Sequence, residues 1–264
     1  MHYRSFRVSC TSLCTVALLL ALTFFGCSSS LELSSKWTNQ ELQITGDQSH
    51  WKDATIDIAG PDVSVGVKND NTNVYVCLIT SNPATQLQIL GLGCITWFDI
   101  GGKKERTFGI GFPVSGLLQG RRFPTRENPE ELQRLIDAAQ RQLEIRGPGE
   151  GERHRMSERD VPSIEVHLGY ADGTLTYELK VPLQKSKEHP YAVQADMTKP
   201  LSVCFETGDL AEAMKGQQAV SNPSRNAGGG RRQVGGAGQG LAGDMPEPLK
   251  HWVTVHLANG SAAK

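Results

Sequence analysis

Short runs of alternating apolar and polar residues recur along the chain from residue 37 onward. Val63, Val65 and Val67 alternate with small or polar residues, which is typical of a strand with one buried face. The polar run 68–73 separates them from the β-branched and aromatic run 74–80. We therefore expect residues 63–80 to form a β-hairpin.

The same pattern continues to the C-terminal end of the chain. Asp172-Gly173 lies between the apolar runs 164–168 and 175–181, and an Asp-Gly pair in that position favours a tight hairpin turn. Further runs predicted to be strands are 87–92, 94–100, 201–207 and 251–257. Many short strands separated by turn residues predict an all-β, antiparallel β-sandwich or barrel.

One α-helix is expected as an insert, at residues 128–143. Asn128 is suited to the N-cap, Pro129 to the first helical position and Glu131 to a capping box. The apolar residues of this segment recur at helical spacing and form one stripe, made of Leu132, Leu135, Ile136, Ala139 and Leu143. We expect the stripe to cover a face or an edge of the sheet.

Two further inserts are predicted to be loops. Residues 146–160 are charged and contain glycine, so we expect a mobile charged loop. Residues 217–243 are rich in glycine and contain too few apolar residues to pack, which predicts a disordered, flexible loop.

The first 26 residues have the three parts of an export signal. Arg4 and Arg7 precede the apolar run 13–25, and Gly26 precedes Cys27. The apolar run is shorter than the ~20 residues that a membrane-spanning helix needs. We therefore expect residues 1–26 to be a signal peptide that is removed on export.

The sequence Phe24-Phe25-Gly26-Cys27 resembles the lipobox of bacterial lipoproteins, although that family usually has Leu where this chain has Phe24. The resemblance implies acylation of Cys27, palmitate included, with residues 27–36 as a tether, and several acyl chains give stable anchoring. Ser28 in place of an aspartate implies the outer membrane, with the domain facing the periplasm or the cell surface. Ordinary cleavage without lipidation is the alternative.

Composition and charge exclude few functions. The formal net charge is -1 and the charged residues amount to 21%, which gives no electrostatic reason to expect a nucleic acid partner. Beyond the leader the chain has Cys77, Cys94 and Cys204. Three cysteines allow at most one intramolecular disulfide, and buried free thiols are the simpler interpretation.

Several segments occur in the order seen in the family 9 carbohydrate-binding modules and the related DOMON-like domains. They are 44–47 (Ile-Thr-Gly-Asp), 50–54 (His-Trp-Lys-Asp-Ala), 96–99 (Thr-Trp-Phe-Asp), 173–179 (Gly-Thr-Leu-Thr-Tyr-Glu-Leu) and 205–208 (Phe-Glu-Thr-Gly). The chain resembles this family over about residues 38–257, apart from the two inserts. We expect the β-sandwich domain at 37–258 and a C-terminal tail at 259–264. The resemblance implies a jelly-roll-like sandwich.

The resemblance also implies a sugar site, because these modules hold a sugar between two tryptophans. The candidates in this chain are Trp97 and Trp51. For Trp51, in the entry motif, a ring that caps the core is the simpler interpretation. Trp97 is next to Phe98, so one of those two rings must face inward. Trp37 and Trp252 lie near the ends of the domain.

Two cofactors are known among the relatives. Structural calcium is possible at the turn carboxylates Asp47, Asp53, Asp70 and Asp99, because hard cations prefer oxygen ligands.

Haem ligation by Met with His or Lys is the second. His154, Met156, His167 and Met197 are available, but their spacing does not join them into a pair.

No catalytic constellation is evident. Gly109-Ile110-Gly111 lacks the following lysine of a phosphate-binding loop. We expect a non-catalytic, ligand-binding lipoprotein, with glycan or another extracellular molecule as the ligand. The alternatives are a structural or assembly lipoprotein that packs against protein partners, and a haem-binding electron-transfer domain.

Overall fold

The computed structural model describes residues 31–60, 62–114, 129–147, 151–161, 163–209 and 247–260. The expected signal peptide, the predicted lipidation site Cys27 and the glycine-rich segment 217–243 lie outside the described residues. In the part of the chain that is described, no helix has the length and apolar character needed to cross a membrane.

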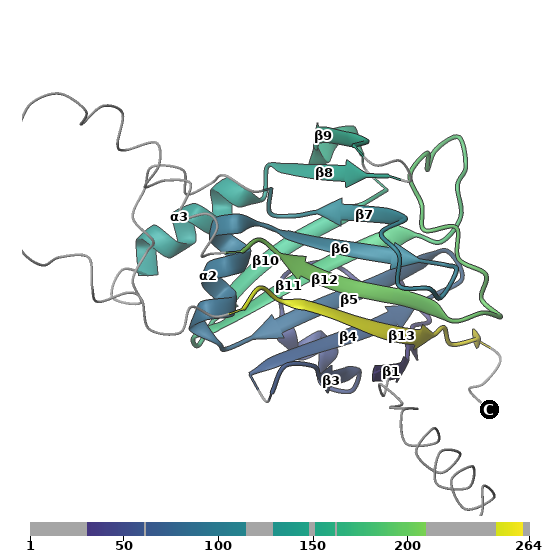
Figure 1. Ribbon diagram of the computed structural model, residues 1–264, viewed down its shortest axis with the longest axis horizontal. Coiled ribbons are helices and arrows are strands. Elements are labelled where there is room, and N and C mark those ends of the chain that lie inside the picture. The colour runs from purple at the N-terminus through teal and green to yellow at the C-terminus, as the bar shows by residue number, and fades with distance from the viewer. Residues whose placement is uncertain are drawn as a thin grey trace, which may run out of the picture. The chain divides into compact units, whose positions relative to one another are not determined.

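The described chain forms two β-sheets, which overlap face to face in Figure 1. The seven-stranded sheet has the order β1-β13-β12-β6-β7-β8-β9. Its strands are β1 (Leu31–Ser34), β13 (Lys250–His256), β12 (Leu201–Thr207), β6 (Cys94–Asp99), β7 (Phe108–Gly111), β8 (Gln142–Arg146) and β9 (Arg153–Ser157).

The second sheet has the order β10-β11-β5-β4-β2, with β3 also paired to β4. Its strands are β10 (Glu165–Ala171), β11 (Thr174–Pro182), β5 (Asn73–Thr80), β4 (Val63–Asn69), β2 (Lys36–Trp37) and β3 (Thr55–Asp57). Only the β1–β13 and β2–β4 pairs are parallel among these strands. The predicted all-β, antiparallel sandwich is confirmed.

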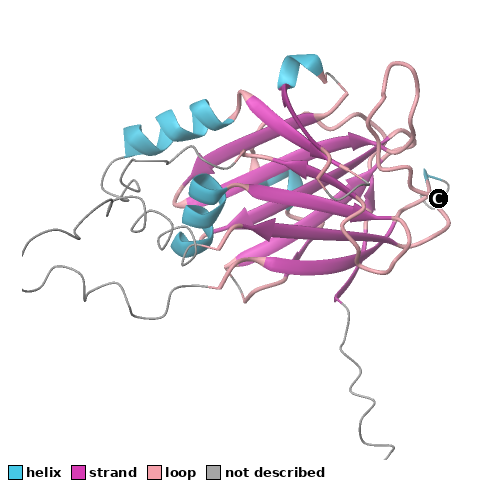
Figure 2. Cartoon of the chain, turned by 45° about the horizontal axis from the view of Figure 1, so that its top comes forward, coloured by secondary structure: helices cyan, strands magenta, loops and turns pink. Residues whose placement is uncertain are grey.

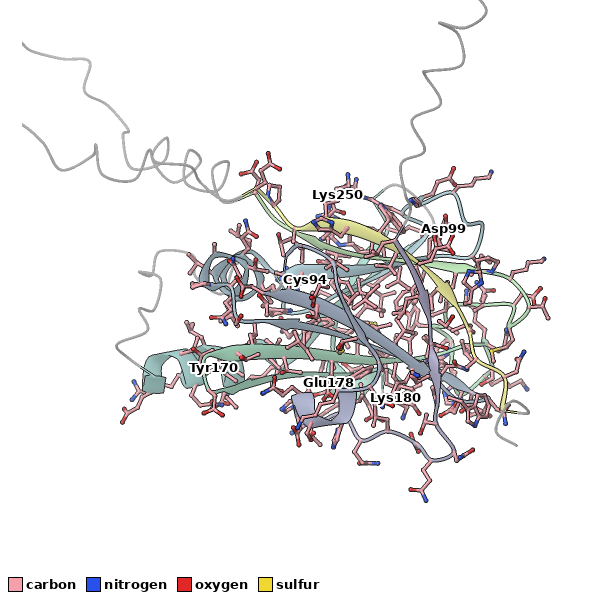
Figure 3. All side chains as sticks on the ribbon, turned by 90° about the horizontal axis from the view of Figure 1, so that it is seen from below. Cys94, Asp99, Tyr170, Glu178, Lys180 and Lys250 are labelled. Atoms are coloured by element: carbon pink, nitrogen blue, oxygen red, sulfur yellow. The ribbon has the colours of Figure 1, made fainter. Side chains whose placement is uncertain are left out.

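A continuous apolar core fills the space between the sheets. Tyr177 of β11 lies between the rings of Phe112 and Phe205, with centroid distances of 5.8 and 6.0 Å. Its hydroxyl forms a hydrogen bond of 2.9 Å with the Thr96 hydroxyl of the other sheet. The inner faces therefore interdigitate, as sandwich packing requires. Figure 3 shows Cys94 between the two sheets, with Lys250 and Asp99 on one side and Glu178 and Lys180 on the other.

Both predicted hairpins are present. In the β10–β11 hairpin, Asp172 and Gly173 have φ angles of 51° and 79°, the left-handed values that a type I′ turn needs. In the β4–β5 hairpin, the Asp70 carboxylate accepts hydrogen bonds from the backbone N–H groups of Thr72 and Asn73, at 2.6 and 2.7 Å.

The prediction of a strand at residues 87–92 is wrong, because this segment belongs to helix α2 (Pro83–Leu92). The Asn82 side chain caps the helix by accepting hydrogen bonds from the N–H groups of Ala84 and Thr85, and Pro83 occupies its first turn. This helix and α3 lie at the same end of the sandwich (Figure 2).

The predicted helical insert is shorter than expected. Helix α3 spans Pro129–Ala139, and Leu143 belongs to strand β8 instead. Leu143 and Ile145 are buried on the core side of β8, and Glu144 between them points outward. The alternation in residues 142–146 therefore belongs to a strand. The sequence predicts Leu143 in the helix because it also lies at helical spacing from Ala139.

The segment expected as a mobile charged loop, 146–160, contains ordered structure. Strand β9 and the 3-10 helix η3 (Glu158–Asp160) occupy most of its described residues. Strand β9 is the edge of the seven-stranded sheet, where charged side chains remain in water and discourage pairing with other chains.

The folded domain begins earlier than the predicted tether allows. Strand β1 starts at Leu31 and pairs in parallel with β13, and β2 begins at Lys36. Leu33 is buried in the core. Strand β1 has four residues, which is too short for its alternation of apolar and polar residues to be recognised in the sequence.

Candidate functional site

The outer face of the seven-stranded sheet carries two neighbouring rows of side chains. Residues opposite one another on paired strands point to the same side of a sheet. The tryptophan row consists of Trp252, Cys204, Trp97, Gly109, Arg146 and Arg153. The glutamate row consists of Lys250, Glu206, Ile95, Gly111, Glu144 and Arg155.

Glu206 joins the two rows near the middle of this face. Its Oε2 atom accepts hydrogen bonds from Trp97 Nε1 at 2.8 Å and from Arg106 Nε at 2.9 Å. The Arg106 guanidinium also donates to the second carboxylate oxygen, so the pair is bidentate. The Glu206 side chain is only 17% exposed, and this fork fixes the orientation of both partners.

A second carboxylate, Glu144, is held in the same manner on the other side of strand β7. Arg146 Nε donates to Glu144 Oε1 at 2.6 Å, and the Arg155 guanidinium lies 3.8 Å from Oε2. The Glu144 side chain is 10% exposed. Each carboxylate is thus neutralised by arginine and keeps little contact with water.

Between the two carboxylates, strand β7 presents glycines instead of side chains. A Cβ atom on Gly109 would lie 2.6 Å from Cε3 of Trp97, closer than side chains approach one another. The indole ring therefore rests on the bare backbone of β7. Glycine in a strand often marks such a close approach.

The two tryptophans of the row differ in exposure. Trp97, a predicted ligand platform, is 7% exposed and points to the outer face, since Phe98 beside it enters the core. Trp252 is partly exposed and also points outward, because Val253 and Val255 are buried in the core. Trp252 is thus the ring on this face that a ligand can reach directly.

Trp51, the other predicted platform, does not contribute to this face. It has no solvent exposure, and its Nε1 donates to Glu178 Oε1 at 2.6 Å, on the outer side of the six-stranded sheet. A ring without exposure presents no face to a sugar. Trp51 belongs to a second, smaller buried cluster, with Ala54, Tyr75 and Cys77, that packs the segment before β3 onto this sheet.

Trp37 lies on strand β2, in the six-stranded sheet. Its Nε1 donates to the side-chain oxygen of Asn39 at 2.9 Å, and Gly260 packs against its ring. It is partly exposed but lies on the other sheet from Trp252 and Trp97.

Each of the four aspartates considered for calcium already accepts a hydrogen bond or forms an ion pair within the protein. Asp47 accepts from the Ser49 N–H group at 2.8 Å, which lowers its pKa. Asp53 pairs with Lys68 at 3.0 Å, and Asp70 caps its turn. Asp99 accepts from the N–H group of Gly101 at 2.8 Å. No group of three or more metal-ligating side chains occurs among the described residues.

The residues considered for haem lie on different surfaces. His154 and Met156 are on β9, at the edge of the seven-stranded sheet. His167 is on β10 opposite Glu178, on the outer side of the six-stranded sheet, where burial lowers its pKa. Met197 packs against the core. The structure does not bring these side chains together.

Cys77, Cys94 and Cys204 are all free and buried. Burial raises the pKa of each thiol, in the case of Cys204 to about 12. A thiol with a raised pKa is a poor nucleophile near neutral pH, so these cysteines are structural. The segment Gly109-Ile110-Gly111 lies in strand β7.

No known protein family matches the sequence. No curated protein matches it either.

Two solved structures of a family 9 carbohydrate-binding module from Caldicellulosiruptor kristjanssonii are similar to the chain. The complex with glucose is 7% identical, with a TM-score of 0.33, over 67% of this chain and 78% of that one. The complex with cellotriose is 6% identical, with a TM-score of 0.36, over 88% of this chain and 97% of that one. Similarity at this level assigns no ligand to the chain.

Sequence reasoning missed Trp252, Glu206 and Arg106 as site residues. Alternation along 250–256 places Lys250, Trp252 and Thr254 on one face, and this signal was available. What the sequence did not indicate is that β12 pairs with β6, which brings Glu206 next to Trp97.

Proposed function

We propose that this chain binds glycan without chemically altering it, through the outer face of its seven-stranded sheet. The observation that carries the proposal is the position of Trp252, partly exposed, in the same row as Trp97 and its Glu206–Arg106 fork. A sugar needs a flat apolar ring against one face of its pyranose and polar groups around its edge. This face supplies both.

The polar groups of this face are held in place before any ligand arrives. Glu206 and Glu144 are both bonded to arginine and mostly buried, so their orientation costs little further entropy on binding. Their arginines are partly exposed and have donors that can reach hydroxyl or carboxylate oxygens. A preorganised polar surface of this kind suits a ligand rich in hydroxyl groups.

The alternative of an assembly subunit receives less support. Docking between proteins generally uses a contiguous apolar patch. Among the described residues, the exposed large hydrophobic side chains are Leu31 and Ile100, on β1 and in the turn after β6. They lie apart from the two rows described above.

We further propose that the domain is exported and anchored through an acylated Cys27 in the outer membrane. The lipobox-like sequence that ends at Cys27 supports this location. A Cys27→Ser variant is expected to leave the membrane fraction when cells are fractionated. A variant that stays membrane-bound after cleavage of the leader contradicts the anchor.

Glycan binding is tested by native electrophoresis of the full chain through gels that contain soluble polysaccharides. We expect at least one polysaccharide to retard the chain. Trp252→Ala should abolish the retardation, because it removes the ring on which the sugar stacks. Trp37→Ala is the matched control, since Trp37 is also partly exposed but lies on the other sheet. Loss of retardation in the control alone, or in neither variant, contradicts the proposed face.

A further inference from the structure

The two rows on the outer face hold more cations than acids, although the chain as a whole has a net charge of -1. The charged side chains of the rows and their neighbour Arg106 are Lys250, Arg146, Arg153, Arg155 and Arg106 against Glu206 and Glu144. Positive charge thus exceeds negative charge within the two rows, although Asp99 and Glu32 lie on the same face at positions beside the rows.

The excess positive charge of the two rows lies on two side chains, Lys250 and Arg153. Both carboxylates are already paired, Glu206 with Arg106 and Glu144 with Arg146 and Arg155. Within the described residues, Lys250 and Arg153 are exposed and form no ion pair. Their charges are therefore available to a ligand.

These two free cations lie at opposite ends of the rows, on β13 and β9. Five inter-strand steps separate the two strands, which corresponds to about 24 Å at ~4.8 Å per step. The face is therefore long enough for several sugar units, with one free cation near each end. Lys250 is also two residues from Trp252 on the same strand, about 7 Å away.

We propose that the ligand of this face is an acidic glycan, a polymer whose sugar units carry carboxylate or sulfate groups. This inference rests on the proposed glycan-binding function. A sugar stacked on Trp252 has its acidic group within reach of Lys250, and a distant unit of the same polymer pairs with Arg153. A carboxylate or sulfate gains charge-assisted hydrogen bonds from these groups that a neutral sugar does not gain.

The paired carboxylates favour a glycan over a nucleic acid on the same surface. Glu206 and Glu144 pair with the arginines Arg106, Arg146 and Arg155. This leaves two free cations in the rows, too few for a nucleic acid backbone that carries a phosphate at every nucleotide. The position of the two carboxylates between the free cations suits a polymer that offers hydroxyl groups along its middle and can place acidic groups at both ends.

The test compares dextran with dextran sulfate and polygalacturonate, using the full chain purified in a non-ionic detergent. Dextran and dextran sulfate share one backbone, so their difference isolates the charge, and polygalacturonate distinguishes carboxylate from sulfate. We expect at least one acidic polymer to bind about tenfold more tightly than dextran. The double variant Lys250→Gln/Arg153→Gln should lose that advantage.

The control is Lys36→Gln/Lys187→Gln, which removes the same charge from exposed positions outside the rows and should retain the preference. Equal binding of dextran and the acidic polymers, with loss of both in Trp252→Ala, overturns the acidic preference but leaves the proposed function intact. If none of the polysaccharides tested here or by electrophoresis binds, the proposed function itself fails. An unaffected double variant, or equally tight binding of single-stranded poly(dT), also overturns the inference.

Discussion

Glu178 is a fully buried carboxylate whose hydrogen bonds attach the N-terminal segment to the six-stranded sheet. It accepts from Trp51 Nε1 at 2.6 Å, from the Thr45 N–H group at 2.7 Å and from the N–H group of Gly46. A charge buried in this way is tolerated because several donors replace its water. Three hydrogen bonds of the segment that contains Trp51 therefore converge on a single side chain.

The variant Glu178→Gln should destabilise the domain by about 2–4 kcal/mol. Glutamine has one acceptor oxygen in place of two and directs an N–H₂ group at buried donors. Chemical denaturation of wild type and variant measures the difference. Glu188→Gln, an exposed carboxylate outside the strands, is the control and should leave the denaturation midpoint unchanged. An equal midpoint for Glu178→Gln contradicts this role.

Asp70 makes the stability of the β4–β5 turn dependent on pH. Burial raises the pKa of its carboxyl group, but hydrogen bonds from Tyr75, Thr72 and Asn73 outweigh this effect and leave the pKa below its usual value. A carboxylate with a lowered pKa stabilises the fold above the unfolded pKa of about 3.9. That contribution disappears as the pH falls through the folded pKa.

We therefore expect Asp70→Asn to lower the melting temperature most above pH 4 and progressively less as the medium becomes more acidic. Melting curves of the two proteins from pH 7 to pH 2 show this as convergence. Asp172→Asn, in the exposed turn between β10 and β11, serves as a control and should not converge with wild type in this manner. Melting temperatures of Asp70→Asn that stay parallel to wild type over the whole range are inconsistent with the account.

At the scale of the elements, the hairpins could be predicted because their signals are local. Alternating valines predicted β4, and Asp172-Gly173 predicted the β10–β11 turn. Helix α2 was missed because its apolar residues are not confined to one stripe, and a short apolar run does not distinguish a buried helix from a strand. The Asn82-Pro83 pair was the helix-start signal that should have been weighed.

The candidate site was harder to predict because it depends on strand order. Glu206 and Trp97 are 109 residues apart in sequence, and their contact requires β12 to lie beside β6. Alternation shows which residues share a face of one strand but not which strands are neighbours. The partner that buries Trp51, Glu178, could not be predicted for the same reason, since it is 127 residues away in sequence.

Strand β7 sets the shape of the outer face through its glycines. The variant Gly109→Ala places a methyl group against the Trp97 ring, where the distance to Cε3 is 2.6 Å. We expect a loss of about 1–3 kcal/mol from such overpacking, together with a change in indole fluorescence as the ring moves.

The matched control is Gly147→Ala, where an added Cβ meets nothing within 4 Å. Its stability and fluorescence should remain close to those of wild type. If Gly109→Ala behaves like this control, the Trp97 ring is not fixed on β7.

At the scale of the whole molecule, the net charge of -1 does not show how the charged side chains are distributed over the surface. It correctly gives no reason to expect a strong overall field. However, the two rows of the outer face and Arg106 together hold five cations against the two acids Glu206 and Glu144. The net charge of the whole chain therefore does not predict the local charge of one face of a sheet, because strand order and register decide which charged side chains share that face.

The most direct test of the account is to record the indole N–H signals of the full chain by NMR during titration with polygalacturonate. The chain has four tryptophans. Trp252 and Trp97 report on the outer face, Trp51 on the buried cluster beside the six-stranded sheet, and Trp37 on strand β2 of that sheet. We predict that the Trp252 signal shifts most, that Trp97 follows, and that Trp51 and Trp37 stay in place. Shifts confined to Trp37 or Trp51, with Trp252 unchanged, would contradict glycan binding at the outer face of the seven-stranded sheet.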